Sequence, residues 1–106
     1  MKIYLDDVRP TPDGWVRCYW PEEVITLLQA NPGKVTHLSL DHDLGDLDND
    51  QRNGYAVLLW LEQEVALNGF IPPQTITVHS DNSSARIKME SAIKAIRRLH
   101  QRNQQN

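Results

Sequence analysis

Hydrophobic and polar positions divide the chain into short apolar runs and longer segments with helical spacing. Runs rich in strand-forming residues stand at 2–5, 16–20, 35–40 and 75–78. The run at 16–20 is the weakest of these. Apolar side chains recur three and four positions apart, as in amphipathic helices, at 21–30, 54–69 and from 82 onward. The pattern therefore predicts strands that alternate with helices along most of the chain.

Residues that begin and end helices agree with these boundaries. Pro21 suits the first turn of a helix, and the acidic pair that follows it suits the positive end of the helix dipole. The sequence Asn-Pro-Gly at 31–33 ends that segment, and Gly69 is a typical residue after the second helix. Asn82 is a good N-cap for the third helix.

Strands that alternate with helices favour a parallel sheet covered on both faces. We therefore predict an α/β fold, a three-layer α/β/α arrangement around a mostly parallel four-stranded sheet. The length of 106 residues suits one domain spanning 1–106. In such sheets ligands bind beyond the carboxyl ends of the strands.

Composition and charge limit the classes of protein to consider. Hydrophobic residues make up 40% and charged residues 24%, which is typical of a globular chain, and Cys18 is a single cysteine. No apolar run reaches the ~18 residues of a membrane span, and the first residues do not resemble a signal peptide. We expect a cytoplasmic protein without a membrane partner. Residues 1–50 hold ten acidic and four basic residues, whereas 51–106 hold four acidic and seven basic ones.

Four aspartates follow two of the predicted strands. Asp6 and Asp7 come directly after the first strand, and Asp41 and Asp43 after the strand at 35–40. The carboxyl ends of parallel strands share one edge, so these carboxylates would lie close together and repel. A divalent cation, Mg²⁺ or Mn²⁺, would relieve that repulsion. The alternative is that the aspartates cap local turns.

A second polar group follows the last predicted strand. His79 and Ser80 end that strand, and Asn82 begins a helix whose N-terminus can bind an anion. His79 could act as a general acid or base, or it could be a packed, hydrogen-bonded histidine. Arg9 could bind a phosphate or neutralise the acidic cluster.

The remaining polar segments carry weaker signals. The loop at 45–54 resembles a calcium loop in its aspartate spacing, but Gln51 and Val57 replace the required glycine and glutamate. We interpret it as a lid or as a solvated loop. The basic residues of the last helix suit its C-terminal end, so we expect no sequence-specific DNA recognition.

Four motifs together resemble one family over nearly the whole chain: LDDVRPTPDGW, LSLDHDLG, the pair Gly54-Tyr55, and ITVHSDNSSA before a helix. They are similar to the cyclic-phosphate-processing receiver-like domains of the response-regulator-like superfamily. The resemblance implies that Asp6 and Asp7 bind metal, that Asp41 matches the phosphoacceptor, and that Ser80 contacts phosphate. A signalling receiver also needs a lysine after a fifth strand, and the sequence offers none there. The resemblance thus favours a trimmed, flavodoxin-like fold that lacks the fifth strand.

These observations lead to one hypothesis and one rival. The hypothesis is a metal-dependent phosphoesterase that processes a cyclic phosphate on an RNA end or a nucleotide. Its expected metal ligands are Asp6, Asp7, Asp41 and Asp43; its expected proton shuttle is His79; and its expected phosphate ligands are Arg9, Ser80 and Asn82. Asp41 could instead act as a nucleophile. The rival is a non-catalytic receiver-like module that binds a partner or a nucleotide. The sequence leaves the oligomeric state open.

Overall fold

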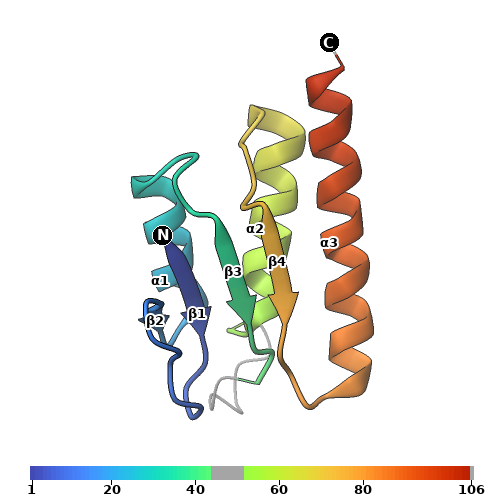
Figure 1. The fold of residues 1–106 in the computed structure, drawn as a ribbon. Coiled ribbons are helices and arrows are strands. Elements are labelled where there is room, and N and C mark those ends of the chain that lie inside the picture. Colours follow the sequence, from blue (N-terminus) through green and yellow to red (C-terminus); the bar gives the residue numbers. More distant parts are fainter. Residues whose placement is uncertain (44–51, 106) are drawn as a thin grey trace.

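The computed structural model describes residues 1–43 and 52–105. It contains, in chain order, β1 (Lys2–Leu5), β2 (Val16–Cys18), α1 (Pro21–Ala30), β3 (His37–Leu40), α2 (Gly54–Asn68), β4 (Thr75–Val78) and α3 (Ser83–Gln104) (Figure 1). The predicted order of elements is confirmed. Most of the polar loop predicted at 45–54 lies outside the described residues.

The four strands form one sheet in which every neighbouring pair is parallel, in the order β2-β1-β3-β4. Tyr4 of β1 pairs with Arg17 on one side and with Ser39 on the other, and Ser39 pairs with Thr77. The chain leaves β1 for the outer strand β2 and then returns to β3. This change of direction creates a crevice at the carboxyl ends of β1 and β3, where ligands bind in open α/β sheets.

One hydrophobic core lies between the sheet and the helices. Alternate strand residues point into it, and the three helices contribute their apolar sides. The largest fully buried side chains are Ile3, Leu5, Leu28, Leu38, Leu40, Leu58, Leu61, Met89 and Ile96. All of them belong to a single buried cluster. The three described helices therefore cover the same face of the sheet.

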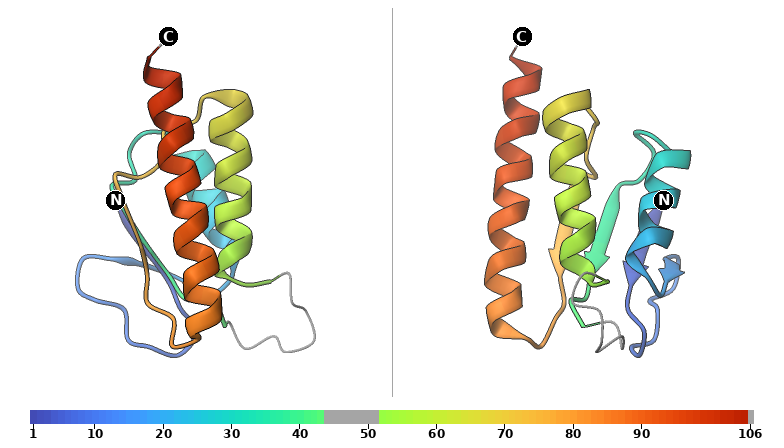
Figure 2. Two further views of the ribbon diagram at one scale, coloured as in Figure 1. Left: turned by 90° about the vertical axis from the view of Figure 1, so that its right-hand side faces the viewer. Right: turned by 180° about the vertical axis from the view of Figure 1, so that it is seen from behind.

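The layering differs from the prediction, because the described helices form one layer. Figure 2 shows α1, α2 and α3 on one side of the strands, and α2 packs against both of its helical neighbours. The four-stranded parallel α/β sheet is confirmed, but no helix of the described residues covers its other face. Residues 37–40 and 75–78 explain this difference, because they alternate polar and apolar side chains strictly. That pattern indicates strands buried on one face only.

Local signals account for the helix ends. The Asn53 side chain accepts a hydrogen bond from the Ala56 N–H at the start of α2, and Asn82 does the same for the Ala85 N–H in α3. Gly69 ends α2 in the left-handed conformation, with φ of 66°. Within the described residues, no helix combines the length and the apolar character that a membrane span requires.

Candidate functional site

Asp6 is a buried carboxylate that follows β1 directly, with 1% of its surface exposed. The chain turns back over it, so that Oδ1 accepts hydrogen bonds from the N–H groups of Val8 at 2.8 Å and Arg9 at 2.9 Å. Its Oδ2 atom lies 3.0 Å from His79 Nε2. Burial alone would raise the pKa of Asp6, but the two N–H groups and His79 outweigh it, and the pKa falls below its ordinary value. Asp6 is therefore ionised at neutral pH.

Asp41 follows β3 and faces Asp6 across the crevice. Its N–H donates to the Leu5 carbonyl at 3.0 Å, and its Oδ1 accepts from the His42 N–H at 2.8 Å. Burial raises the pKa of Asp41, and the negative charge of Asp6 raises it further. The two carboxylates thus behave differently, since only Asp41 is held in a site that disfavours its charge.

Gly54 allows α2 to begin against the backbone of Asp41. A Cβ atom at Gly54 would lie 1.9 Å from the Asp41 carbonyl oxygen and 3.0 Å from Met89 Cε. The Gly54 N–H also donates to the His42 carbonyl at 3.3 Å. The close approach therefore requires glycine, and it determines the position of the Asp41 backbone.

His79 follows β4 and lies between the two aspartates and the open face of the sheet. Its N–H donates to the Leu40 carbonyl at 3.0 Å, its Nδ1 lies 2.7 Å from Ser39 Oγ, and its ring stacks on Tyr4 with centroids 4.4 Å apart. Burial lowers the pKa of His79, although the contact with Asp6 opposes that change. The neutral ring satisfies both contacts when Nε2–H donates to Asp6 and the Ser39 hydroxyl donates to Nδ1.

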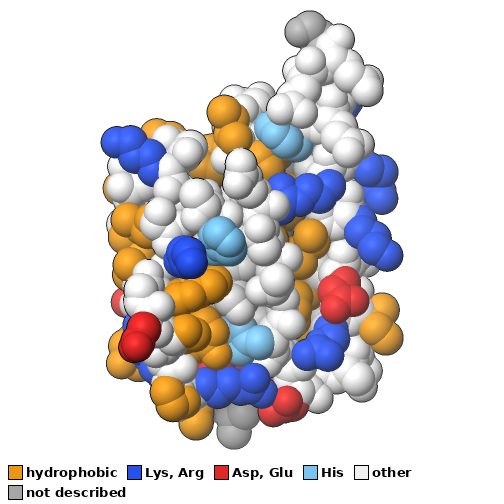
Figure 3. All heavy atoms as spheres, in the orientation of Figure 1, with side chains coloured by type: hydrophobic (Ala, Val, Ile, Leu, Met, Phe, Trp, Pro, Cys, Tyr) orange, Lys and Arg blue, Asp and Glu red, His pale blue; other side chains and the backbone are white. Residues whose placement is uncertain are grey.

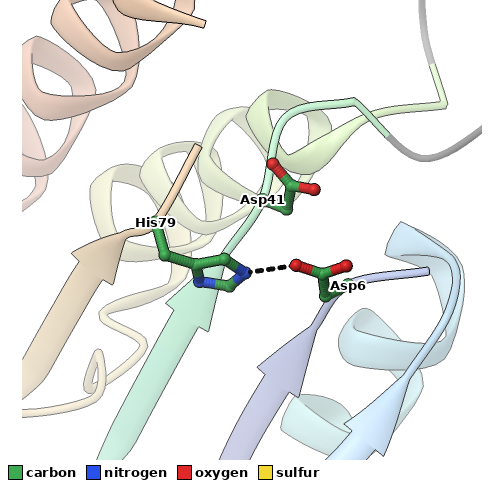
Figure 4. Close-up of side chains that lie close together, drawn as sticks. All are labelled: Asp6, Asp41 and His79. Carbon is green, nitrogen blue, oxygen red and sulfur yellow. Dashed lines mark hydrogen bonds and ion pairs between the residues drawn. The ribbon is translucent and has the colours of Figure 1, made fainter. Parts of the chain in front are cut away.

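Asp6, Asp41 and His79 converge from the ends of β1, β3 and β4 (Figure 4). Each offers one ligand atom, and these atoms lie within 4.8 Å of one another. Two carboxylates and an imidazole suit divalent cations such as Mn²⁺, and the carboxylate oxygens also suit Mg²⁺. The donor set therefore fits a divalent cation.

Asp7 and Asp43 lie in the wall of the pocket, outside this three-residue cluster. The pocket has a volume of about 380 Å³ and is lined by Asp6, Asp7, Val8, Arg9, Asp41, Asp43 and Asp81. The Asp43 side chain is 64% exposed and accepts a hydrogen bond from His42 Nδ1 at 2.8 Å. Both residues can contribute to the negative charge around a cation, but the three-residue cluster does not include them.

Arg9 is the one basic residue among the described residues that line this pocket. Its Nη2 atom lies 2.9 Å from Asp81 Oδ2, and its Nε lies 3.9 Å from Asp6 Oδ2. The Asp81 side chain is 95% exposed, so this ion pair is solvated and an anion can compete for the guanidinium. In the part of the chain that the structure describes, five carboxylates and one guanidinium line the pocket, which is consequently strongly acidic.

Ser80 and Asn82 shape the turn into α3 and are not among the residues that line the pocket. Ser80 is 2% exposed, and its Oγ accepts a hydrogen bond from the Asn82 N–H at 3.1 Å. The Asn82 side chain caps α3, as the sequence indicated. Their role as phosphate ligands stays a prediction.

The sequence pattern did not single out Tyr4, Ser39 or Asp81. Tyr4 and Ser39 occupy outward-facing positions of β1 and β3, where the alternating pattern places polar or aromatic side chains beside the strand ends. That alternation was a signal that could have connected Ser39 to His79. Asp81 offered no comparable signal, because its pairing with Arg9 depends on the three-dimensional path of two loops.

The fold and the site define a receiver-like α/β domain with an acidic pocket at the carboxyl edge of its sheet. The chain matches the family model of the cyclic-phosphate processing receiver domain over residues 1–95, and it belongs to that family. No curated protein and no solved structure matches the chain. In the described residues the sheet has four strands, and Lys88 and Lys94 lie within α3. Neither lysine occupies the strand-end position that a signalling receiver uses.

Proposed function

We propose that this domain is a metal-dependent phosphoesterase that hydrolyses a cyclic phosphate on a nucleotide or an RNA end. The convergence of Asp6, Asp41 and His79 within 4.8 Å is the observation that carries the proposal. A proton-transferring group then lies beside two candidate metal ligands. The family membership supports the substrate class, because its model describes cyclic-phosphate processing.

The acidic pocket supports the requirement for a cation. Among residues 1–43 and 52–105, five carboxylates line it with a single guanidinium, so an anionic phosphate would be repelled from the protein alone. Asp6 and Asp41 would hold Mg²⁺ or Mn²⁺, with Asp7 and Asp43 nearby in the wall. Such a cation would polarise the phosphoryl oxygens and lower the pKa of a bound water.

His79 would transfer the proton that hydrolysis requires. Water forms a new bond to phosphorus, the ring P–O bond breaks, and the proton lost by water ends on the leaving alkoxide oxygen. Burial lowers the pKa of His79, which favours the neutral ring. With a cation bound to Asp6 and Nδ1–H donating to the Ser39 hydroxyl, the Nε2 lone pair would accept the proton from water, and Nε2–H would then pass it to the leaving oxygen. Ser39 can donate or accept at Nδ1, and it therefore accommodates both protonation states of the ring.

Arg9 would bind the phosphate in place of Asp81, its exposed ion-pair partner. Ser80 and Asn82 would support the same anion from the start of α3. An alternative course, in which Asp41 attacks phosphorus and forms an acyl phosphate, uses the same residues.

The decisive experiment measures turnover of 2′,3′-cyclic and 3′,5′-cyclic nucleotides and of RNA with a cyclic-phosphate end, in the presence of Mg²⁺ or Mn²⁺. We expect His79→Ala to lower kcat about 10²–10⁴-fold and to leave KM nearly unchanged, because a proton shuttle acts mainly in the transition state. Arg9→Ala should raise KM as well. Lys94→Ala, on the exposed surface of α3, is the matched control and should behave as wild type.

Two controls separate a catalytic defect from other defects. The His79→Ala protein must keep its circular dichroism spectrum, and it must still be stabilised by the cation. Loss of the cation effect would make His79 a metal ligand rather than a shuttle. If wild type binds a cyclic phosphate and turns over none of them, the protein is the non-catalytic binding module.

A further inference from the structure

The uncovered face of the sheet is the feature that the proposed reaction does not explain. All-parallel sheets almost always have both faces covered, yet within the described residues only one face carries helices. Outward-facing positions of the strands are occupied by Lys2, Tyr4, Arg17, His37, Ser39, Thr75 and Thr77. Figure 3 looks onto this face, where hydrophobic, histidine and basic side chains lie side by side. Tyr4 and Ser39 are buried at the centre of this face, whereas Lys2, His37, Thr75 and Thr77 are at least partly exposed around them.

Aromatic rings run across this face without interruption from the site. His79 stacks on Tyr4, the Tyr4 ring lies 6.1 Å from Trp15, and the Trp15 ring lies 5.9 Å from His37. Lys2 Nζ lies over the Trp15 ring, 5.8 Å from its centroid. Trp15 and His37 are partly exposed, whereas Lys2 is exposed. The rings therefore form a path from the candidate catalytic histidine to the open surface, with a cation beside it.

The chemistry of the face distinguishes between possible occupants. A docking helix buries aliphatic side chains, but the seven outward strand positions hold threonine, serine, lysine, arginine, histidine and tyrosine. None of these positions carries a carboxylate, in contrast to the acidic pocket at the end of the strands. Aromatic rings with basic side chains are the means by which proteins bind single-stranded RNA, through base stacking and phosphate pairing.

We infer that this open face binds the nucleotides that precede the reacting phosphate in a single-stranded RNA. The substrate class is then an RNA strand with a cyclic-phosphate end, whose bases stack on Trp15 and His37 and whose backbone pairs with Lys2. The identity of the strand's end rests on the proposed function. The stacking surface itself rests on the rings and charges of the open face.

The test compares the binding of three fluorescently labelled ligands by anisotropy. These ligands are a hexanucleotide RNA with a 2′,3′-cyclic phosphate end, the same RNA with a 3′-hydroxyl, and a 2′,3′-cyclic mononucleotide. We expect both hexanucleotides to bind more tightly than the mononucleotide. Trp15→Leu should weaken hexanucleotide binding roughly 5- to 150-fold, the loss of one stacked base, and should not change mononucleotide binding. Leucine was chosen because its apolar side chain can still pack against Tyr4 while it removes the aromatic ring.

Lys2→Ala is a second test variant. It does not disturb the hydrophobic core, because Lys2 is exposed. It should weaken hexanucleotide binding and reduce the slope of log affinity against log salt by about 0.7, the loss of one phosphate contact. Arg98→Ala is its matched control, because Arg98 lines the groove between α2 and α3. This control should leave both the affinity and the slope unchanged.

The outcomes separate this inference from the proposed reaction. Hexanucleotide binding that depends on Lys2 and Trp15 supports the inference, even if no cyclic phosphate is turned over. Turnover of the mononucleotide with no tighter binding of either hexanucleotide overturns the inference and leaves the reaction standing. Equal hexanucleotide binding by wild type, Lys2→Ala and Trp15→Leu also overturns it, and so does the absence of all RNA binding.

Discussion

The two neighbouring aspartates should respond in opposite ways when each is replaced by asparagine in metal-free buffer. Asp41 has a raised pKa, so its ionised form destabilises the native state, whereas the lowered pKa of Asp6 means that its ionised form stabilises it. At neutral pH, Asp41→Asn should therefore increase the free energy of unfolding, and Asp6→Asn should decrease it. Both replacements keep a carbonyl oxygen that can accept the existing backbone hydrogen bonds.

The expected gain for Asp41→Asn follows from the distance between the carboxylates. Ligand atoms of the two residues lie within 4.8 Å, and unit charges at that separation repel by about 3.5 kcal/mol at an effective dielectric constant of about 20. Nearby N–H groups and His79 reduce this repulsion, so we expect a gain of about 1–2 kcal/mol. For a domain of this size, that gain in the free energy of unfolding corresponds to a rise in Tm of roughly 5–10 °C.

The expected loss for Asp6→Asn follows from its hydrogen bonds. Two backbone N–H groups donate to its buried carboxylate, and hydrogen bonds to a charged group each contribute about 1.5–3 kcal/mol. A neutral amide keeps the geometry but weakens both bonds, and its N–H₂ group cannot accept from His79 Nε2. We expect a loss of about 2 kcal/mol.

The assay is urea and thermal denaturation, first with a chelator and then with Mg²⁺ or Mn²⁺. A cation at ten times its Kd stabilises the native state by about 1.4 kcal/mol, and neither variant should retain that response. Asp13→Asn is the matched control, because Asp13 is an exposed carboxylate that is not among the residues lining the pocket. It should keep the response. The reasoning fails if Asp41→Asn and Asp6→Asn shift metal-free stability in the same direction, or if either one responds to the cation as wild type does.

Two further predictions concern Gly54 and His79. Gly54→Ala should lower the free energy of unfolding by about 1–3 kcal/mol in urea titrations, because the new Cβ overlaps the Asp41 carbonyl, whereas an unhindered helical Gly→Ala would raise it by up to about 1 kcal/mol. The lowered pKa of His79 means that the native state binds fewer protons there than the unfolded state, so stability should be lost as pH falls from about 7 towards 5. His79→Gln should show a smaller loss over that interval, and an equal loss would remove His79 as its cause.

The position of the site could be predicted because it depends on strand ends alone. Once four runs are recognised as parallel strands, their carboxyl ends must share an edge, and the polar residues after them must meet there. Asp6, Asp41 and His79 follow this rule directly. The rule could not predict that Asp6 would be the buried aspartate. Its burial depends on the turn after β1, in which the N–H groups of Val8 and Arg9 donate hydrogen bonds to its carboxylate.

In the described residues the helices cover one face of the sheet, although the general rule for parallel sheets predicted helices on both faces. Here the local sequence pattern was the better guide. Alternation of strands and helices favours two covered faces. The strict alternation of polar and apolar residues at 37–40 and 75–78 indicated one open face, and the structure agrees with that local pattern. Ser39 shows the consequence, because it is polar on the open face and lies where it can bond to His79.

The open face and the candidate site share Tyr4, and this sharing links the two proposals physically. The Tyr4 ring stacks on His79 and also packs nearly perpendicular to Trp15, so it connects the proton-transferring group to the surface that would hold the bases. A base that stacks on Trp15 would therefore restrict Tyr4 and, through it, the His79 ring. His79 is also held by Ser39 and Asp6, and a ring held from three sides keeps Nε2 directed at the acidic pocket. In the proposed reaction, the same packing that receives the RNA strand would thus orient the proton shuttle.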